Sequence, residues 1–184
     1  EVFRRYPRSR LKMSRIAGYI AENPDLDLGS MLQAQTSMPH WTCEILEQRS
    51  ARLGYTGAIE GCVAKSQDQV VVIDGTIYNA PDLSEGNDAE VILNLYLRHG
   101  FADTLAKLNG DFAIALFDSR TNEIWLGRDR IGIKPLYYAP LSNGLAFASR
   151  CKPLLRLPGV SREPNSQFVA LIAASHYRHF DNQP

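Results

Sequence analysis

No hydrophobic stretch in this sequence of 184 residues approaches the length that crosses a bilayer. A transmembrane helix needs roughly 20 consecutive apolar residues, whereas the longest apolar runs here, such as 112–117, have the length of a strand. An excess of one charge is also absent, since Lys plus Arg and Asp plus Glu each total 20. We therefore predict a soluble protein that binds neither a membrane nor, through its overall charge, nucleic acid.

Cysteine and histidine are scarce and dispersed. The three cysteines have no CxxC spacing: Cys43, Cys62 and Cys151. This usage favours reduced thiols in a cytoplasmic protein over a disulfide framework or a zinc site. The four histidines are His40, His99, His176 and His179. The last two are spaced to share a helix face, but two ligands do not make a metal site, and we predict none.

Composition and length indicate one globular domain. Hydrophobic residues make up 45% and charged residues 22% of the chain, which excludes a disordered or collagen-like protein. Residues 1–12 are basic, with four arginines and Lys12 against Glu1. We expect a disordered extension there or read-through upstream of a true start at Met13; the alternative is a nucleic-acid arm or a targeting segment.

Strand patterns outnumber helix patterns. Strands are predicted at 16–20, 53–58, 62–64, 70–73, 112–118, 123–127, 136–139 and 145–149, with a turn at 23–25. Helices are predicted at 28–35, at 44–48, between Asn87 and Gly100, and at 165–176; the third has the Asn87/Glu90 pattern of a capping box. Hairpins that alternate with helices predict an α+β fold with mostly antiparallel sheets.

Two segments are candidates for chemistry, although none of the common phosphate-loop, nucleophile-elbow or zinc-helix motifs is present. Segment 74–79 follows a predicted strand, and its backbone N–H groups suit an oxyanion or a carboxylate. From the residues alone, an ordinary loop with Gly75 at positive φ is the main interpretation and the anion site the other. Segment 128–135 is a charged turn, for which an ion-paired loop is the main interpretation and a phosphate site the other.

Six segments, in order, resemble the class II glutamine amidotransferase domain of asparagine synthetases. They are 13–18 (MSRIAG), 74–79 (DGTIYN), 88–92 (DAEVI), 108–113 (LNGDFA), 127–138 (GRDRIGIKPLYY) and 147–155, and together they cover about 13–157. The resemblance implies a four-layer α/β/β/α sandwich of two mostly antiparallel sheets, of the N-terminal nucleophile hydrolase type.

The resemblance also implies a mechanism. In that family an N-terminal Cys attacks the side-chain amide of glutamine, with its own α-amino group as the base. An Asn side chain and the following Gly N–H stabilise the oxyanion, and the ammonia travels to a C-terminal ATP-pyrophosphatase synthetase domain. This sequence has no Ser-Gly-Gly-x-Asp-Ser loop. We expect residues 13–184 to be a C-terminally truncated domain without cofactor, with ATP and Mg²⁺ bound only in the missing synthetase domain.

The family's functional positions fall on altered residues. Ser14 occupies the nucleophile position and Arg15 follows it, where the family has a small residue. Asp74 replaces the Asn donor beside Gly75, the second oxyanion position. The glutamine-binding positions are Arg52, Thr76 and Asp88, of which Thr76 replaces the usual Glu. We predict that Asp74 pairs with Arg15 or Arg52 and fills the empty glutamine site; the alternative is an exposed Asp that caps its own turn.

These changes predict a glutaminase-like module without glutaminase activity in an ATP-dependent, amide-forming enzyme similar to asparagine synthetase. β-Lactam synthetases and lasso-peptide cyclases resemble this arrangement, since their substrates supply the amine. The expected partner is the C-terminal synthetase domain, which would bind a small-molecule or peptide substrate; a homodimer is a further option. One alternative is an active glutaminase with Ser14 as nucleophile. Another is a free-standing binding or regulatory domain.

Overall fold

The strands form two antiparallel sheets. The computed structural model describes residues 14–21, 26–58 and 61–174. The five-stranded sheet has the order β2 (Thr42–Gln48), β3 (Ala51–Gly57), β1 (Ser14–Ala21), β9 (Gly144–Ala148) and β8 (Tyr137–Leu141). The four-stranded sheet has the order β4 (Val63–Lys65), β5 (Gln69–Ile77), β6 (Gly110–Asp118) and β7 (Glu123–Arg128). Every neighbouring pair in both sheets is antiparallel, as predicted.

Side-chain alternation along β1 explains how the five-stranded sheet is covered on both faces. Ile16 is buried in the cluster shared with the four-stranded sheet, whereas Ala17 and Tyr19 belong to a second cluster. That second cluster includes residues of α1 (Leu28–Gln33) and α5 (Cys151–Leu154). The strand therefore joins the central core to an outer helical layer.

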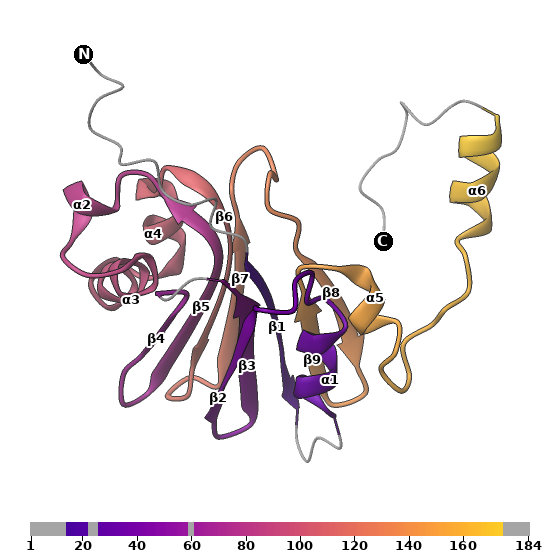
Figure 1. The fold of residues 1–184 in the computed structure, drawn as a ribbon, viewed down its shortest axis with the longest axis horizontal. Coiled ribbons are helices and arrows are strands. Elements are labelled where there is room, and N and C mark those ends of the chain that lie inside the picture. The colour runs from indigo at the N-terminus through magenta and orange to yellow at the C-terminus, as the bar shows by residue number, and fades with distance from the viewer. Residues whose placement is uncertain (1–13, 22–25, 59–60, 175–184) are drawn as a thin grey trace.

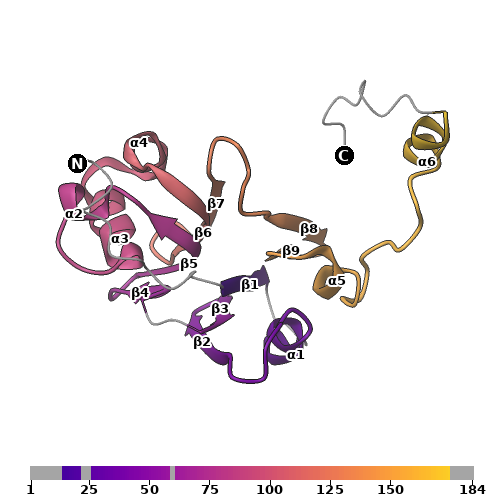
Figure 2. The ribbon, with the colours of Figure 1, turned by 45° about the horizontal axis from the view of Figure 1, so that its top comes forward.

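Helices also cover the outer face of the four-stranded sheet, where α3 (Asp88–His99) packs on β5 and β4. The short helices α2 (Ala80–Leu83) and α4 (Phe101–Lys107) flank α3 on the same side (Figures 1 and 2). Asn87 and Glu90 make both bonds of a capping box, and Gly100 ends the helix. The predicted helix and the four-layer α/β/β/α arrangement of two antiparallel sheets are thus confirmed.

Two sequence predictions are wrong. Segment 44–48 is part of β2 and not a helix, because it pairs with β3 along its whole length, from Glu44 opposite Tyr55 to Gln48 opposite Ala51. Segment 74–77 does not leave the sheet as a turn. Strand β5 continues to Ile77, since β6 remains beside it to the end.

The last described helix, α6 (Ser166–Ala173), is shorter than predicted and buries none of its residues. Figure 1 shows it apart from the sheets, at the end of an extended segment. The basic segment 1–12, the turn at 23–25, and His176 and His179 lie outside the described residues. Within the described ranges, every helix is too short or too polar to traverse a bilayer.

Candidate functional site

The first residue of β1 and the sixth of β5 meet where the two sheets face each other. Ser14 Oγ donates a hydrogen bond of 3.2 Å to Asp74 Oδ1, and both residues are fully buried. The two come from different sheets and stand 60 positions apart in sequence. The packing of the two sheets thus places the predicted nucleophile position beside the predicted oxyanion position.

Asp74 accepts further bonds from two residues that the sequence reasoning did not assign to the site. Ser149, directly after β9, donates from Oγ to Asp74 Oδ2 at 3.0 Å, and it accepts the backbone N–H of Ile16 at 2.9 Å. Lys134, in the loop between β7 and β8, lies with Nζ 3.0 Å from Asp74 Oδ1. A buried carboxylate is therefore held by two hydroxyl groups and one ammonium group, which together offset its desolvation.

Arg15 is a more distant cation at the same carboxylate. Its Nη1 lies 3.9 Å from Asp74 Oδ2 and donates instead to the backbone oxygen of Ser14 at 2.6 Å. The guanidinium also lies 5.9 Å from the centre of the Trp41 ring. Arg15 Nε is buried without a hydrogen-bond partner. The predicted pairing of Asp74 with Arg15 is therefore present only at long range, whereas the close cation is Lys134, which was not predicted.

Gly75 is required by its surroundings. Its φ is 131°, and a Cβ atom there would lie 1.9 Å from the backbone oxygen of Asp111 on β6. Thr76 follows, opposite Asp111 in the sheet, and the carboxylate of Asp88 accepts the backbone N–H of Ile77 at 3.3 Å. Positions 75, 76 and 88 thus gather around the end of β5, within a few residues of Asp74.

Arg52 lies elsewhere. It stands opposite Tyr19 in the sheet, whereas Ser14 stands opposite Gly57. Arg52 donates to Tyr19 Oη at 3.2 Å and lies 3.0 Å from Glu47 Oε1. The Tyr19 hydroxyl, followed by Glu47, raises the pKa of Arg52. The structure does not bring Arg52 to Ser14 or Asp74, and the burial of Asp74 excludes an exposed, turn-capping Asp.

The loop that carries Lys134 is organised by one buried carboxylate. Asp129 accepts backbone N–H groups from Ile131 at 3.1 Å, Ile133 at 3.0 Å and Lys134 at 3.1 Å. Burial favours the neutral acid, but the backbone donors outweigh it and lower the pKa of Asp129. Segment 128–135 is thus a loop ordered mainly by bonds from its own backbone, with its ion pair made to β5.

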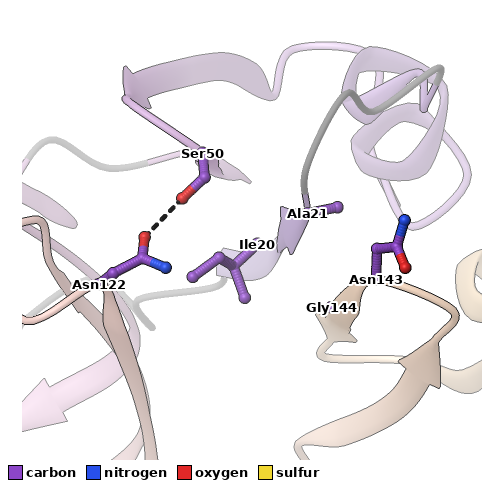
Figure 3. A pocket seen from close by; sticks show the side chains of 6 residues that line it. All are labelled: Ile20, Ala21, Ser50, Asn122, Asn143 and Gly144. Carbon is purple, nitrogen blue, oxygen red and sulfur yellow. Dashed lines mark hydrogen bonds between the residues drawn. The ribbon is translucent and has the colours of Figure 1, made fainter.

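Two cavities have linings that do not include the residues of this cluster. One is at the opposite end of β1, where Ser50 Oγ donates to Asn122 Oδ1 at 2.8 Å beside Ile20 and Ala21 (Figure 3). The other includes Tyr78, whose hydrogen bond to Asp111, with burial, raises its pKa to about 12. Neither cavity is lined by Ser14 or Asp74. Among the described residues, no cluster of three or more His, Cys, Asp or Glu could hold a metal ion.

Comparison with known proteins identifies relatives for most of the chain. A family model described as "Glutamine amidotransferase domain" matches residues 39–183. Putative asparagine synthetase [glutamine-hydrolyzing] 2 of Methanocaldococcus jannaschii is 37% identical over 106 residues, which cover 53% of this chain and 20% of that protein. Asparagine synthetase [glutamine-hydrolyzing] 2 of Bacillus subtilis is 39% identical over 107 residues, which cover 52% of this chain and 14% of that protein.

The fold has a solved counterpart. Glutamine phosphoribosylpyrophosphate amidotransferase from B. subtilis superposes with a TM-score of 0.55 at 16% identity, over 76% of this chain and 42% of that chain. The curated relatives named above are much longer than the segment that they share with this chain, which spans at most 20% of their length. The chain belongs to the glutamine amidotransferase domain family, in the form found in asparagine synthetase-like proteins.

Proposed function

We propose that this domain does not hydrolyse glutamine and serves instead as a structural and interface module of an ATP-dependent, amide-forming enzyme. The observation that carries the proposal is the buried Asp74 carboxylate, which accepts bonds from Ser14, Ser149 and Lys134. Glutamine hydrolysis requires donors aimed at the position where negative charge develops. An ionised carboxylate only accepts hydrogen bonds, so Asp74 cannot serve as that donor.

The nucleophile position supports the same conclusion. The Ser14 hydroxyl is fully buried and donates its hydrogen bond to Asp74. Ser14 in place of the Cys nucleophile and Asp74 in place of the Asn donor remove two elements of the mechanism that the family resemblance implies.

Exposed apolar side chains support the role as an interface. The loop after β7 presents Ile131 and Ile133 to solvent, β8 presents Tyr138, and α6 buries no residue. Ile131 and Ile133 lie two residues apart in one loop, and neighbouring exposed apolar groups mark surfaces for association. We propose a C-terminal ATP-pyrophosphatase synthetase domain as the partner, which would bind ATP and Mg²⁺ and join a carboxylate to an amine of its own small-molecule or peptide substrate.

A serine-dependent glutaminase is the second candidate. The observation that favours it is the 3.2 Å bond from Ser14 Oγ to Asp74 Oδ1, which places a carboxylate where it can accept the nucleophile's proton. This arrangement provides a base but still no oxyanion donor at position 74.

Ammonia release from glutamine distinguishes the two functions. The full chain and a chain that begins at Ser14 are assayed with saturating glutamine, with Ser14→Ala as the control in each length. We expect glutamine-dependent ammonia no higher than that of the control. Sustained turnover that disappears with Ser14→Ala would establish the serine-dependent glutaminase and refute the proposal.

A further inference from the structure

Lys134 reaches the buried cluster from a surface loop with a fixed backbone. The Asp129 carboxylate binds the N–H groups of Ile131, Ile133 and Lys134, and Pro135 follows immediately. The lysine side chain keeps 20% of its surface exposed, while Asp74 keeps none. Its four-carbon stem therefore runs from the solvent boundary inward to the carboxylate.

The ammonium group is the close cation in a nearly complete polar shell. Lys134 Nζ and Ser14 Oγ share Asp74 Oδ1, at 3.0 Å and 3.2 Å, and Ser149 Oγ holds Oδ2 at 3.0 Å. Arg15 stands at 3.9 Å, beyond hydrogen-bond range. Hydroxyl groups can solvate a buried carboxylate but cannot neutralise it, and Lys134 supplies the nearer of the two positive charges at Asp74.

We infer that Asp74, Ser14 and Ser149 form a binding site for a primary alkylammonium group, and that Lys134 is its built-in occupant. The inference rests on the proposed function, because a permanent cation in this site belongs to a domain that no longer admits glutamine. It adds a ligand class: once the lysine stem is removed, the site takes a free alkylamine in its charged form. The exposed part of the stem marks the route by which that amine enters.

The test is chemical rescue of Lys134→Ala in the full chain. Removal of the lysine side chain leaves the Asp74 carboxylate without its close cation, and we expect the melting temperature to fall by about 6–20 °C. n-Propylammonium chloride replaces the missing three carbons and the nitrogen. At about ten times its Kd it should raise the melting temperature of Lys134→Ala by about 3–6 °C over equal sodium chloride.

Four controls define the recognised group. n-Propanol, which has the same shape without the charge, should not stabilise Lys134→Ala. Lys134→Met keeps the stem in place, so n-propylammonium should not stabilise it, and the wild-type protein should not respond either. Lys134→Ala combined with Asp74→Asn should lose the response. If Lys134→Ala melts without a clear transition, its refolding yield from urea with and without n-propylammonium gives the same comparison.

Rescue of Lys134→Ala by the amine, with no response in any of the four controls, supports the inference. No rescue, equal rescue by n-propanol, or rescue that survives Asp74→Asn overturns it. Glutamine hydrolysis is not measured in any arm. A negative result in the rescue experiment therefore leaves the proposal of an inactive glutaminase untouched. Conversely, glutaminase activity found in the ammonia assay would refute that proposal without changing the melting temperatures measured here.

Discussion

Asparagine at position 74 provides the sharpest test of why this domain should be inactive. The starting protein begins at residue 14 and carries Ser14→Cys and Arg15→Gly, which supply a thiol nucleophile, a free amine and a small neighbour. The second protein carries Asp74→Asn as well. Because Asp74 Oδ1 lies 3.2 Å from Ser14 Oγ, an amide nitrogen in its place would be a donor within reach of the reacting carbon's oxygen.

The expected gain follows from that donor. One oxyanion-hole hydrogen bond contributes about 2.7–4 kcal/mol, or about 10²–10³-fold in kcat. The replaced carboxylate would also repel the developing oxyanion, so we expect glutamine hydrolysis at least about 100-fold faster in the protein with Asp74→Asn. Ammonia is followed by coupled NADH oxidation at a pH above about 8, where the α-amine is largely neutral.

Equal rates in the two proteins would refute the reasoning, because the carboxylate would then be no obstacle to the chemistry. Asp74→Asn leaves Lys134 without its anion, so folding is checked in both proteins by circular dichroism and thermal melting. The comparison is valid when both retain a cooperative transition well above the assay temperature.

Three further predictions concern stability. Gly75→Ala should lower the melting temperature by more than about 8 °C, because its Cβ would lie 1.9 Å from the backbone oxygen of Asp111. The control is Gly159→Ala, at φ 80° with nothing within 4 Å, which should reduce the free energy of unfolding by only about 1–2 kcal/mol. Asp118→Ala should reduce the urea-derived free energy of unfolding by about 2 kcal/mol, because that buried carboxylate accepts from Gln69, Tyr96 and Arg120; no loss would contradict this. The lowered pKa of Asp129 stabilises the fold above the ordinary Asp value of 3.8, and this is lost as pH falls below that value through the folded-state pKa. Amide exchange in 131–134, corrected for intrinsic rates, should therefore accelerate in acid, and Asp129→Asn should remove that pH dependence.

Local patterns predicted the elements whose structure is determined locally. The capping box at Asn87 and the apolar run at 70–73 are examples, since each depends on residues close in sequence. Segment 44–48 misled because its strand conformation comes from pairing with β3. A short segment with both helical and strand propensity is decided by its partners, which the residues of the segment do not reveal.

The residues of the candidate site also differ in how far the sequence could predict them. Ser14 and Asp74 were found from the motifs that contain them, although their contact spans 60 positions. Lys134 and Ser149 lie in the motifs 127–138 and 147–155, yet their roles depend on contacts to Asp74 that span 60 and 75 positions. A lone lysine between Ile133 and Pro135 was the available signal, but it did not specify the partner.

Asp74 is the centre of a buried polar cluster whose hydrogen-bonding capacity is largely used. A carboxylate has about four lone-pair positions, and close donors from Ser14, Ser149 and Lys134 use three of them. These donors come from β1, from the residue after β9, and from the loop before β8, while Asp74 belongs to the other sheet. The cluster therefore ties the two sheets together. Replacing Asp74 with an apolar residue would leave the Ser14 hydroxyl without its partner, and replacing Ser149 would leave the Ile16 N–H without its partner. Stability therefore favours keeping these polar residues.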